Sequence, residues 1–468
     1  MPELTLHGQR VAVVGLGASG VAAARLAAAR GASVVGFDEA PLERLSPQAR
    51  ALGELRAGAL AQGAFDDFDL VVVSPGVPEN AALLSATVRG VEVIGELELA
   101  SRALPDSLPL VLIGGTNGKS TVTALTAALF AKAGHRTFLG GNFGTPLSEC
   151  DGRATDVAVV EISSFQAERV PTLHARGHAL LNVTPDHLDR YASLEAYARA
   201  KGNPFERMNA GDVAVVPLKD EECARQARRG SARLVTFGGA PGLGDVGPDG
   251  KGAIVDRLRG DRYSLAELRV SGGHNVQNVC AAVALVSGLA VSGALATPHA
   301  AIAAALAEFR GLPHRNVLVR ELDGVRYYDD SKGTNVGATV AALAGLEEAR
   351  AVLIAGGRDK LGSYEPLVTA LAQKGRALVV IGEAAERIVA AAAGVLPIER
   401  AATMADAVLV ARRLAHPGDA VLLSPACSSY DMFRDYKHRG EVFVREVESL
   451  GSALAGSALA GTARGGTA

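Results

Sequence analysis

The middle of this chain contains the sequence Leu110-Val-Leu-Ile-Gly-Gly-Thr-Asn-Gly-Lys-Ser-Thr121, which predicts a strand, a glycine loop and a helix. Its apolar start is typical of a buried strand, its glycines of a tight loop, and the residues from Lys119 onward of a helix. A loop of this kind directs backbone N–H groups at phosphate oxygens. Lys119 would reach the β- and γ-phosphates and Ser120 would bind Mg²⁺, so the stretch indicates an ATP site.

This loop departs from the standard phosphate-binding pattern by one position. The pattern Gly-x-x-x-x-Gly-Lys-Ser needs a glycine at position 113, where the chain has Ile113, and the first glycine is Gly114. The alternative interpretation is a glycine turn followed by a surface lysine. A Gly-Lys-Ser sequence directly after a strand favours the ATP interpretation.

The same order of strand and helix recurs on both sides of this stretch. A helix is expected over 20–30, and further buried strands at 10–14, 34–37, 70–73, 157–160, 179–183, 213–216, 325–328, 351–354, 377–381 and 420–423. Continuous apolar strands that alternate with helices predict parallel sheets covered on both faces. Residues from about 231 to 275 alternate differently and predict an antiparallel patch.

Turn-rich segments near 102–109 and 311–315 divide the 468 residues into three α/β domains, in line with about 150 residues per domain. We expect a Rossmann-like domain over 1–106, a central P-loop ATPase-like domain over 107–310 and a second Rossmann-like domain over 311–450. The last residues, 451–468, have one charge and little to bury, and we expect a mobile tail there.

Composition excludes several classes of protein. Lys and Arg total 47 against 50 Asp and Glu, a net charge of −3, so no nucleic-acid partner is expected. No apolar run of about 18 residues is free of charge, Gly or Pro, so we expect no membrane span. The four scattered cysteines and a start unlike a signal peptide favour the cytoplasm. We expect a monomer.

A second glycine loop, Gly15-Leu-Gly-Ala-Ser-Gly20, follows the first expected strand, and Asp38 ends the second. This spacing matches the dinucleotide-binding fingerprint. From the residues alone the ligand could be NAD or FAD, another diphosphate such as a nucleotide sugar, or none, with the glycines serving packing only. Ser74-Pro-Gly76 follows the third strand at the same sheet edge, where ligands of such sheets bind.

Glu161 and His187 follow two of the strands expected in the central domain. Both fall on the edge that also bears the Lys119 loop. A carboxylate and an imidazole beside a phosphate loop suit Mg²⁺ that holds triphosphate oxygens. Taken alone, His187 is more readily interpreted as a loop or helix-capping histidine.

With these segments the chain resembles the Mur ligase family, ATP-dependent amide ligases that build the peptidoglycan stem peptide, over about residues 8–448. The similar segments are 74–76, 115–121, 182–191, 274–275, 311–315, 330–335 and 424–431. Segments 330–335 and 424–431 favour the branch of the family that adds D-glutamate to UDP-N-acetylmuramoyl-L-alanine. The resemblance implies three α/β domains, two Mg²⁺ ions, and amide formation through an acyl phosphate.

The resemblance also implies roles for individual residues. Catalytic roles fall to Lys119, Glu161, His187 and Lys201, and metal binding to Ser120, Glu161, His187 and a carbamylated Lys201. ATP contacts fall to Gly114, Gly115, Thr116, Asn117, Gly118, Lys119, Ser120, Thr121, Asn275, Arg315 and Asp330. Nucleotide-sugar contacts fall to Ala18, Ser19, Asp38, Glu39, Ser74, Asn142 and His187, and D-glutamate contacts to Lys332, Thr334, Lys360, Ser429 and Tyr436.

The chain departs from the family pattern in three places. Gly202-Asn-Pro204 follows Lys201 where the family continues with a basic, aliphatic and aromatic helix, and Pro204 is expected to break the helix. Glu39-Ala40 replaces the usual Thr-Arg pair near the uracil, and Tyr436 stands where Phe is common. We interpret Cys427 as a packing residue and not as a nucleophile.

Three rival functions remain from the sequence. One is a family ligase for another amino acid, or a folylpolyglutamate-type enzyme. The second is an NAD-dependent oxidoreductase that uses the loop at 15–20. This function would give the Lys119 loop no ligand to bind. The third is a non-catalytic regulator that binds ATP.

Overall fold

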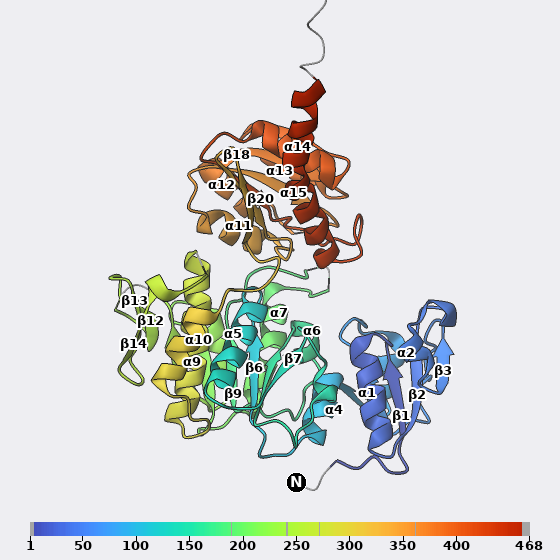
Figure 1. Cartoon of the computed structure of the whole chain (residues 1–468). Helices are drawn as coiled ribbons and strands as arrows, with labels where there is room; N and C mark the ends of the chain where they lie inside the picture. The colour runs from blue at the N-terminus through green and yellow to red at the C-terminus, as the bar shows by residue number, and fades with distance from the viewer. Residues whose placement is uncertain (1–3, 189, 240–241, 271, 361, 461–468) are drawn as a thin grey trace, which may run out of the picture. The chain divides into compact units, whose positions relative to one another are not determined.

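The computed structural model describes residues 4–188, 190–239, 242–270, 272–360 and 362–460, which form three sheets with helices packed on them (Figure 1). These residues divide into two compact units. One unit holds the first two sheets, and the other holds the third sheet with the described residues of segments 184–192 and 270–275. The predicted α/β class with three sheets is confirmed.

The first sheet is parallel, in the order β3-β2-β1-β4-β5. Its elements are β1 (Arg10–Val14), α1 (Ala18–Ala29), β2 (Ser33–Asp38), η1 (Leu42–Arg44), α2 (Pro47–Arg50), β3 (Glu54–Ala57), β4 (Leu70–Val73), α3 (Ala81–Val88), β5 (Glu92–Gly95) and α4 (Glu96–Ala103). The strand order reverses between β1 and β4. The loops after these two strands, at 15–20 and 74–76, therefore flank the point where such sheets bind ligands.

The second sheet runs β14-β13-β12-β11-β10-β9-β6-β8-β7. Its strands are β6 (Leu110–Gly114), β7 (Thr137–Gly141), β8 (Val157–Glu161), β9 (Gly177–Leu180), β10 (Val213–Pro217), β11 (Arg233–Phe237), β12 (Val246–Pro248), β13 (Ala253–Asp256) and β14 (Asp261–Ser264). Its helices are α5 (Lys119–Lys132), η2 (Leu147–Glu149), α6 (Ser164–Ala167), α7 (Leu194–Gly202), η3 (Asn203–Arg207), α8 (Glu221–Ala227), η4 (Leu265–Glu267), α9 (Gly273–Val291) and α10 (His299–Glu308).

The antiparallel patch expected at about 231–275 is smaller than predicted. The β12, β13 and β14 strands pair antiparallel, but β11 pairs parallel with β10 and with β12. The helix α8 lies between β10 and β11 in the chain, and a crossover helix returns the chain for parallel pairing. Short turns at 249–252 and 257–260 leave room only for hairpins.

The third sheet runs β15-β16-β20-β17-β18-β19, with β15 antiparallel to β16 and the other pairs parallel. Its elements are β15 (Val317–Leu322), β16 (Val325–Asp329), α11 (Val336–Gly345), β17 (Ala351–Gly356), α12 (Glu365–Lys374), β18 (Gly375–Ile381), α13 (Ala385–Ala392), β19 (Ile398–Arg400), α14 (Met404–Leu414), β20 (Ala420–Leu423) and α15 (Tyr436–Ala460). Since β16, β20 and β17 are parallel neighbours, the loops that follow them meet at one edge.

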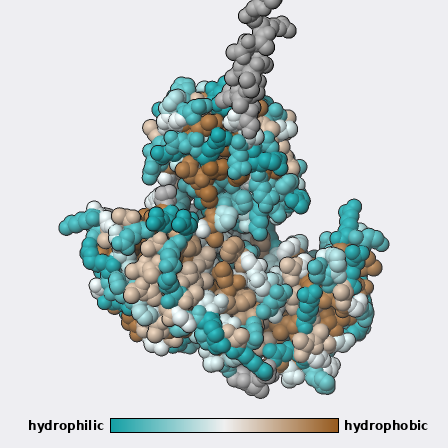
Figure 2. Space-filling model, viewed as in Figure 1, coloured by the Kyte–Doolittle hydropathy of each residue, from teal (hydrophilic) through white to brown (hydrophobic). Residues whose placement is uncertain are grey.

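The helix α15 includes 451–460 of the segment expected to be a tail, and 461–468 lie outside the described residues. Among the described helices, α9 alone is long and apolar enough to cross a membrane, and 61% of its apolar window is buried. Burial of this extent is typical of a core helix. On the face seen in Figure 2, hydrophilic residues cover much of the surface between smaller apolar areas.

Buried carboxylates of α4 join the first sheet to the second within their unit. Glu98 is fully buried and accepts hydrogen bonds from the backbone N–H groups of Thr172 (3.1 Å) and Leu173 (2.9 Å). Glu96 accepts from the backbone N–H and the hydroxyl of Ser148, both at 2.7 Å. Hydrogen bonds to buried carboxylates are strong and costly to break, so these contacts fix α4 on the second sheet.

Candidate active site

The loop after β6 is held by a residue that follows β9. Thr116 N–H donates to the backbone carbonyl of Asn182 (3.0 Å). The Asn182 side chain accepts from Asn117 N–H (2.9 Å) and donates to the Asn117 carbonyl (3.1 Å). Asn182 lies within one of the segments that resemble the family, and no role was predicted for it. The available signal was a polar side chain inside the otherwise apolar stretch 179–183.

Glycines at two positions of this loop are required by the backbone. Gly115 has φ +140° and Gly118 has φ +85°. A Cβ on Gly118 would lie 2.5 Å from Asn278 Oδ1. Gly118 also begins α5 without a capping side chain. Such a helix N-terminus suits a phosphate group, which accepts from backbone N–H groups there.

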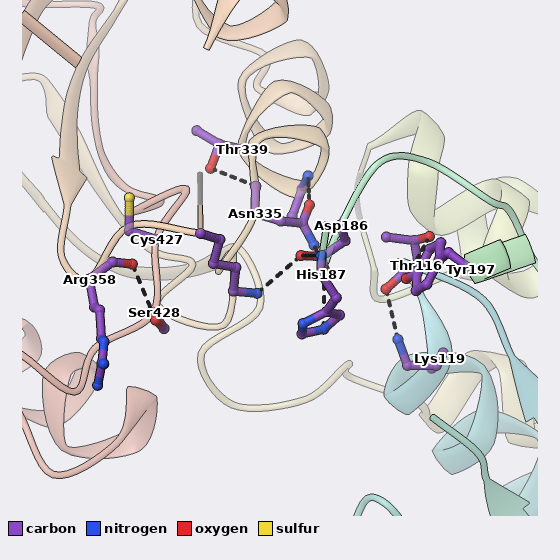
Figure 3. A network of polar contacts seen from close by, with 12 residues as sticks. Thr116, Lys119, Asp186, His187, Tyr197, Asn335, Thr339, Arg358, Cys427 and Ser428 are labelled. Atoms are coloured by element: carbon purple, nitrogen blue, oxygen red, sulfur yellow. Dashed lines mark hydrogen bonds and ion pairs between the residues drawn. The ribbon is translucent and has the colours of Figure 1, made fainter. Parts of the chain in front are cut away.

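Two lysines converge on one carbonyl oxygen of the loop. Lys119 Nζ donates to the carbonyls of Gly115 (2.8 Å) and Thr116 (2.7 Å). Lys201 Nζ donates to the same Gly115 carbonyl (2.7 Å) and lies 4.5 Å from the centre of the Tyr197 ring. The Tyr197 hydroxyl lies 3.2 Å from Thr116 Oγ1, and Figure 3 shows these side chains gathered beside Lys119. The structure thus brings the predicted residues Lys119 and Lys201 together.

Lys201 lies in the last turn of α7, next to the loop after β6. The helix stops at Gly202, and Pro204 lies in the 3₁₀ turn that follows, so the predicted helix break is confirmed. A Cβ on Gly202 would lie 2.2 Å from Gln226 Oε1. Close packing against α8 therefore explains the glycine that departs from the family pattern. Lys201 itself is only 3% exposed.

Glu161 ends β8, the strand that pairs with β6, and so lies on the same edge as the lysines. Asn142 Nδ2 donates to Glu161 Oε1 (2.7 Å), while Oε2 is buried and has no hydrogen-bond partner among the described residues. A buried, unpaired carboxylate oxygen suits a cation. Within the described part of the chain, no group of three or more His, Cys, Asp or Glu is placed to hold a metal ion. Phosphate oxygens, water and the buried Ser120 hydroxyl would complete a Mg²⁺ site, as Mg²⁺ allows.

A buried histidine beneath the loop was missed by sequence analysis. His178, in β9, is fully buried, its Nδ1 lies 3.2 Å from the Leu112 carbonyl, and its ring centre lies 4.3 Å from that of Phe205. A Cβ on Gly114 would lie 3.2 Å from His178 Cε1. Burial lowers the pKa of His178 to about 4. The imidazole is therefore a neutral packing group under the loop.

The loop at 15–20 is braced by Asp38 and Ser74. Asp38 accepts from Leu16 N–H (2.7 Å) and Ala40 N–H (2.9 Å), and the Ser74 hydroxyl donates to the Gly15 carbonyl (2.6 Å). Gly17 precedes α1, and a Cβ built there meets nothing within 4 Å. Of the other residues predicted here, Ala18 and Ser19 open α1 and Glu39 is exposed after β2. Asp38 and Ser74 therefore shape the loop.

Loops after β16, β17 and β20 interlock at the edge of the third sheet. The backbones of Arg358 and Ser428 exchange hydrogen bonds of 2.9 and 3.2 Å, and Ala426 N–H donates to the Gly333 carbonyl (2.9 Å). Lys332 Nζ lies 3.8 Å from the centre of the Tyr436 ring. These bonds bring the predicted segments of Lys332, Thr334, Lys360, Ser429 and Tyr436 together. Cys427 among them is buried, and burial raises the pKa of its thiol to about 11, which agrees with a packing role.

Asp186 is a second residue that sequence analysis left without a role. Its carboxylate accepts from Lys360 Nζ (3.2 Å) and from Asn335 Nδ2 (3.2 Å), within the unit that holds the third sheet. Figure 3 shows Asn335 directed at Asp186 and the His187 ring beside it. His187 belongs to the same segment and has φ +55°. The predicted metal ligand His187 and the other three, Ser120, Glu161 and Lys201, thus belong to different units.

Asp330 is buried behind the loop that carries Lys332. The Ser424 hydroxyl donates to its Oδ2 (2.6 Å), and burial raises the pKa of Asp330 to about 7 against the opposing charge of Arg315. Burial and Arg315 also lower the pKa of His274. Arg315, Asp330 and the 274–275 pair, all predicted for the ATP site, therefore lie in one unit.

Comparisons with known proteins agree with this layout. Residues 9–95 match a profile described as Mur ligase MurD-like, N-terminal domain; residues 113–286 match the Mur ligase middle domain; and residues 314–427 match the Mur ligase, glutamate ligase domain. The solved structure of UDP-N-acetylmuramate-alanine ligase from Thermotoga maritima has a TM-score of 0.58 at 20% identity, covering 94% of this chain and 99% of that one. Folylpolyglutamate synthase from Mycobacterium tuberculosis, complexed with ADP, has a TM-score of 0.54 at 17% identity and covers 69% of this chain and 88% of that one.

Curated relatives are much closer in sequence. The chain is 46% identical over 463 residues to a protein of Anaeromyxobacter dehalogenans named UDP-N-acetylmuramoylalanine--D-glutamate ligase, with 95% of this chain and 98% of that protein covered. A protein of the same name from Geobacter metallireducens is 42% identical over 460 residues, covering 96% and 99%. With identity at this level over nearly the whole chain, and with the glycine loop, its two lysines and Glu161 in place, the chain belongs to the Mur ligase family.

Proposed function

We propose that this chain is an ATP-dependent ligase that joins D-glutamate to UDP-N-acetylmuramoyl-L-alanine in the synthesis of a peptidoglycan precursor. The alanyl carboxylate takes the γ-phosphoryl group of ATP, which gives an acyl phosphate and ADP. The D-glutamate amine attacks the acyl carbon and loses a proton to solvent, and phosphate leaves as the tetrahedral intermediate collapses. Such a reaction needs positioning and charge neutralisation and no protein nucleophile.

The observation that carries the proposal is the convergence of Lys119 and Lys201 on the Gly115 carbonyl, at 2.8 and 2.7 Å. Two ammonium groups on one uncharged oxygen repel each other. A triphosphate in the loop would bring negative charge to both lysines, and its β- and γ-phosphates are the groups that a lysine at the position of Lys119 contacts. Residues 114–121, Asn275, Arg315 and Asp330 are the ATP contacts in this proposal.

The same repulsion supports carbamylation of Lys201. Reaction of its neutral amine with CO₂ would replace the cation by a carbamate, which is negatively charged and accepts metal ions. Ser120, Glu161, His187 and the modified Lys201 would hold Mg²⁺ (two ions in this proposal), which when bound supplies charge neutralisation at the phosphate oxygens. The unpaired Oε2 of Glu161 agrees with this assignment.

The remaining residues divide between the other two substrates. The nucleotide sugar is assigned to Ala18, Ser19, Asp38, Glu39, Ser74, Asn142 and His187. D-glutamate is assigned to Lys332, Thr334, Lys360, Ser429 and Tyr436, because two lysines and nearby hydroxyls suit a dicarboxylate. Domain boundaries at 106/107 and 310/311, a monomeric state and a cytoplasmic location, which the four free thiols support, complete the proposal.

Phosphate release with ATP, Mg²⁺, UDP-N-acetylmuramoyl-L-alanine and D-glutamate tests the proposal. Release that requires both substrates, together with the amide product by mass spectrometry, is the expected result. A panel of L-glutamate, L-alanine, L-lysine and folate-type acceptors separates D-glutamate addition from the other ligases. Absence of release with D-glutamate but release with another acceptor would overturn the assigned substrate. Nicotinamide binding without any ATP turnover would favour an oxidoreductase.

A further inference from the structure

A fully buried arginine lies beneath the loops of the third sheet. Arg439, in α15, has 0% of its surface exposed and is among the largest fully buried side chains of the described chain. Its Nε donates to Ser331 Oγ (3.0 Å), and its Nη2 donates to the carbonyls of Ser331 (2.9 Å) and Cys427 (3.3 Å). Its Nη1 donates to the carbonyls of Cys427 (3.2 Å) and Ser428 (3.3 Å). One guanidinium thus joins two loops to α15.

These loops carry the proposed D-glutamate residues. Ser331 directly precedes Lys332, and Ser428 directly precedes Ser429. The Ser331 hydroxyl also donates to the Tyr436 carbonyl (2.8 Å), one turn before Arg439 on α15. Through the backbone pair of Arg358 and Ser428, the loop that leads to Lys360 is linked to the same place. All four segments are therefore linked to this side chain, three of them directly or through α15 and the fourth through the Arg358–Ser428 pair.

Global stability alone does not explain this arrangement. The acceptors of Arg439 are all uncharged oxygens, and removing a guanidinium from water costs several kcal/mol. Burial lowers the pKa of Arg439 to about 10, so the group keeps its charge near neutral pH. A planar fork of five N–H donors, in contrast, is well suited to fix several carbonyls in one geometry. Its charge also favours anions that bind nearby.

We propose that Arg439 is a positioning residue for the amino-acid substrate, because it holds the loops of Lys332, Ser429 and Tyr436 in the arrangement that receives the dicarboxylate. The inference rests on the proposed function only for the identity of the amino acid. Arg439 does not touch the substrate, since it is completely buried. Because the segments it holds carry Lys332, Ser429 and Tyr436, its effect is expected mainly on the amino-acid substrate.

Steady-state kinetics of Arg439→Lys test this inference. Lysine keeps the charge but loses the fork, so KM for D-glutamate is expected to rise about tenfold or more, while KM for ATP and for the nucleotide sugar stays within about twofold. Arg445→Lys is the matched control, since Arg445 lies on the same helix with 68% of its side chain exposed. If Arg439 only stabilises the fold, the variant should contain less active protein, and none of the three KM values should change relative to the others.

Ser331→Ala gives a second, milder test, should Arg439→Lys not fold. It removes one acceptor of Arg439 and the bond to Tyr436, and KM for D-glutamate is expected to rise about threefold. An unchanged KM for D-glutamate in both folded variants, or equal changes in all three KM values, overturns the inference. If the wild-type protein uses another amino acid instead, the proposed function fails, and the same KM comparison with that amino acid still decides the role of Arg439.

Discussion

The two glycine loops of this chain share a backbone plan and differ in their surroundings. Each follows a buried parallel strand and opens a helix, from β1 into α1 and from β6 into α5. The first loop is braced by a carboxylate and a hydroxyl, Asp38 and Ser74. The second is contacted by two lysines and lies on the same edge as the buried Glu161. The backbone of each loop therefore offers a helix N-terminus suited to a phosphate, and the side chains around the loop indicate what reaction, if any, the phosphate undergoes.

The difference follows from what each site must do. Binding a diphosphate needs N–H groups at a helix N-terminus, which both loops offer. Moving a phosphoryl group needs cations and metal ligands that follow its charge, which only the second loop has among the residues described around the two loops. We therefore assign the nucleotide sugar to the first loop and ATP to the second.

Lys119→Ala should have the largest effect. It removes the cation at the ATP loop, so kcat is expected to fall about a thousandfold or more. Phosphate release under saturating substrates measures it. Lys219→Ala, at an exposed position in the same unit, should leave kcat unchanged. A Lys119→Ala protein with about a tenth of wild-type kcat would show that this loop is not the transfer site.

Lys201→Ala is expected to lower kcat about a hundredfold, because the proposed carbamate would be lost with the side chain. Short carboxylic acids such as acetate should restore part of the activity, since they can replace the missing carboxylate. Short alkylamines serve as the control. Rescue by amines and not by acids would mean that Lys201 acts as a cation, and the carbamate assignment would be wrong.

Sequence analysis predicted the second loop more completely than the third-sheet site for a physical reason. The loop at 114–119 is contiguous, so the residues that indicate its phosphate-binding role are neighbours in the sequence. Arg439 and Asp186 act across long sequence separations, and their partners are mostly backbone carbonyls or residues of other loops. Local sequence patterns do not predict contacts of this kind. His178 was missed because it lies one residue before the strand expected at 179–183, and the sequence pattern did not show that it is buried.

Asp38→Asn is expected to raise KM for the nucleotide sugar about tenfold with little change in KM for ATP, because an amide side chain cannot accept both backbone hydrogen bonds as the carboxylate does. Initial-rate measurements with each substrate varied in turn decide it. Glu43→Gln, an exposed change nearby in sequence, is the control. An equal rise in both KM values would remove the distinction between the loops.

Replacing one glycine in each loop should give the smallest effects. The change is expected in stability for the second loop and in KM for the first. Gly118→Ala forces a left-handed conformation and a close approach to Asn278, and is expected to cost about 1–3 kcal/mol of stability. Gly17→Ala has open space and φ −68°, so its stability should be unchanged and KM for the nucleotide sugar should rise about threefold. Thermal unfolding and initial rates measure the two. A destabilised Gly17→Ala protein would favour a packing role for that glycine.

Isothermal titration calorimetry on the Lys119→Ala and Asp38→Asn proteins tests the division of the two loops most directly. Each variant is titrated with ATP and with UDP-N-acetylmuramoyl-L-alanine. Lys119→Ala is expected to lose affinity for ATP and keep affinity for the nucleotide sugar, while Asp38→Asn is expected to do the reverse. Loss of the same ligand in both variants would show that the two loops do not bind different ligands.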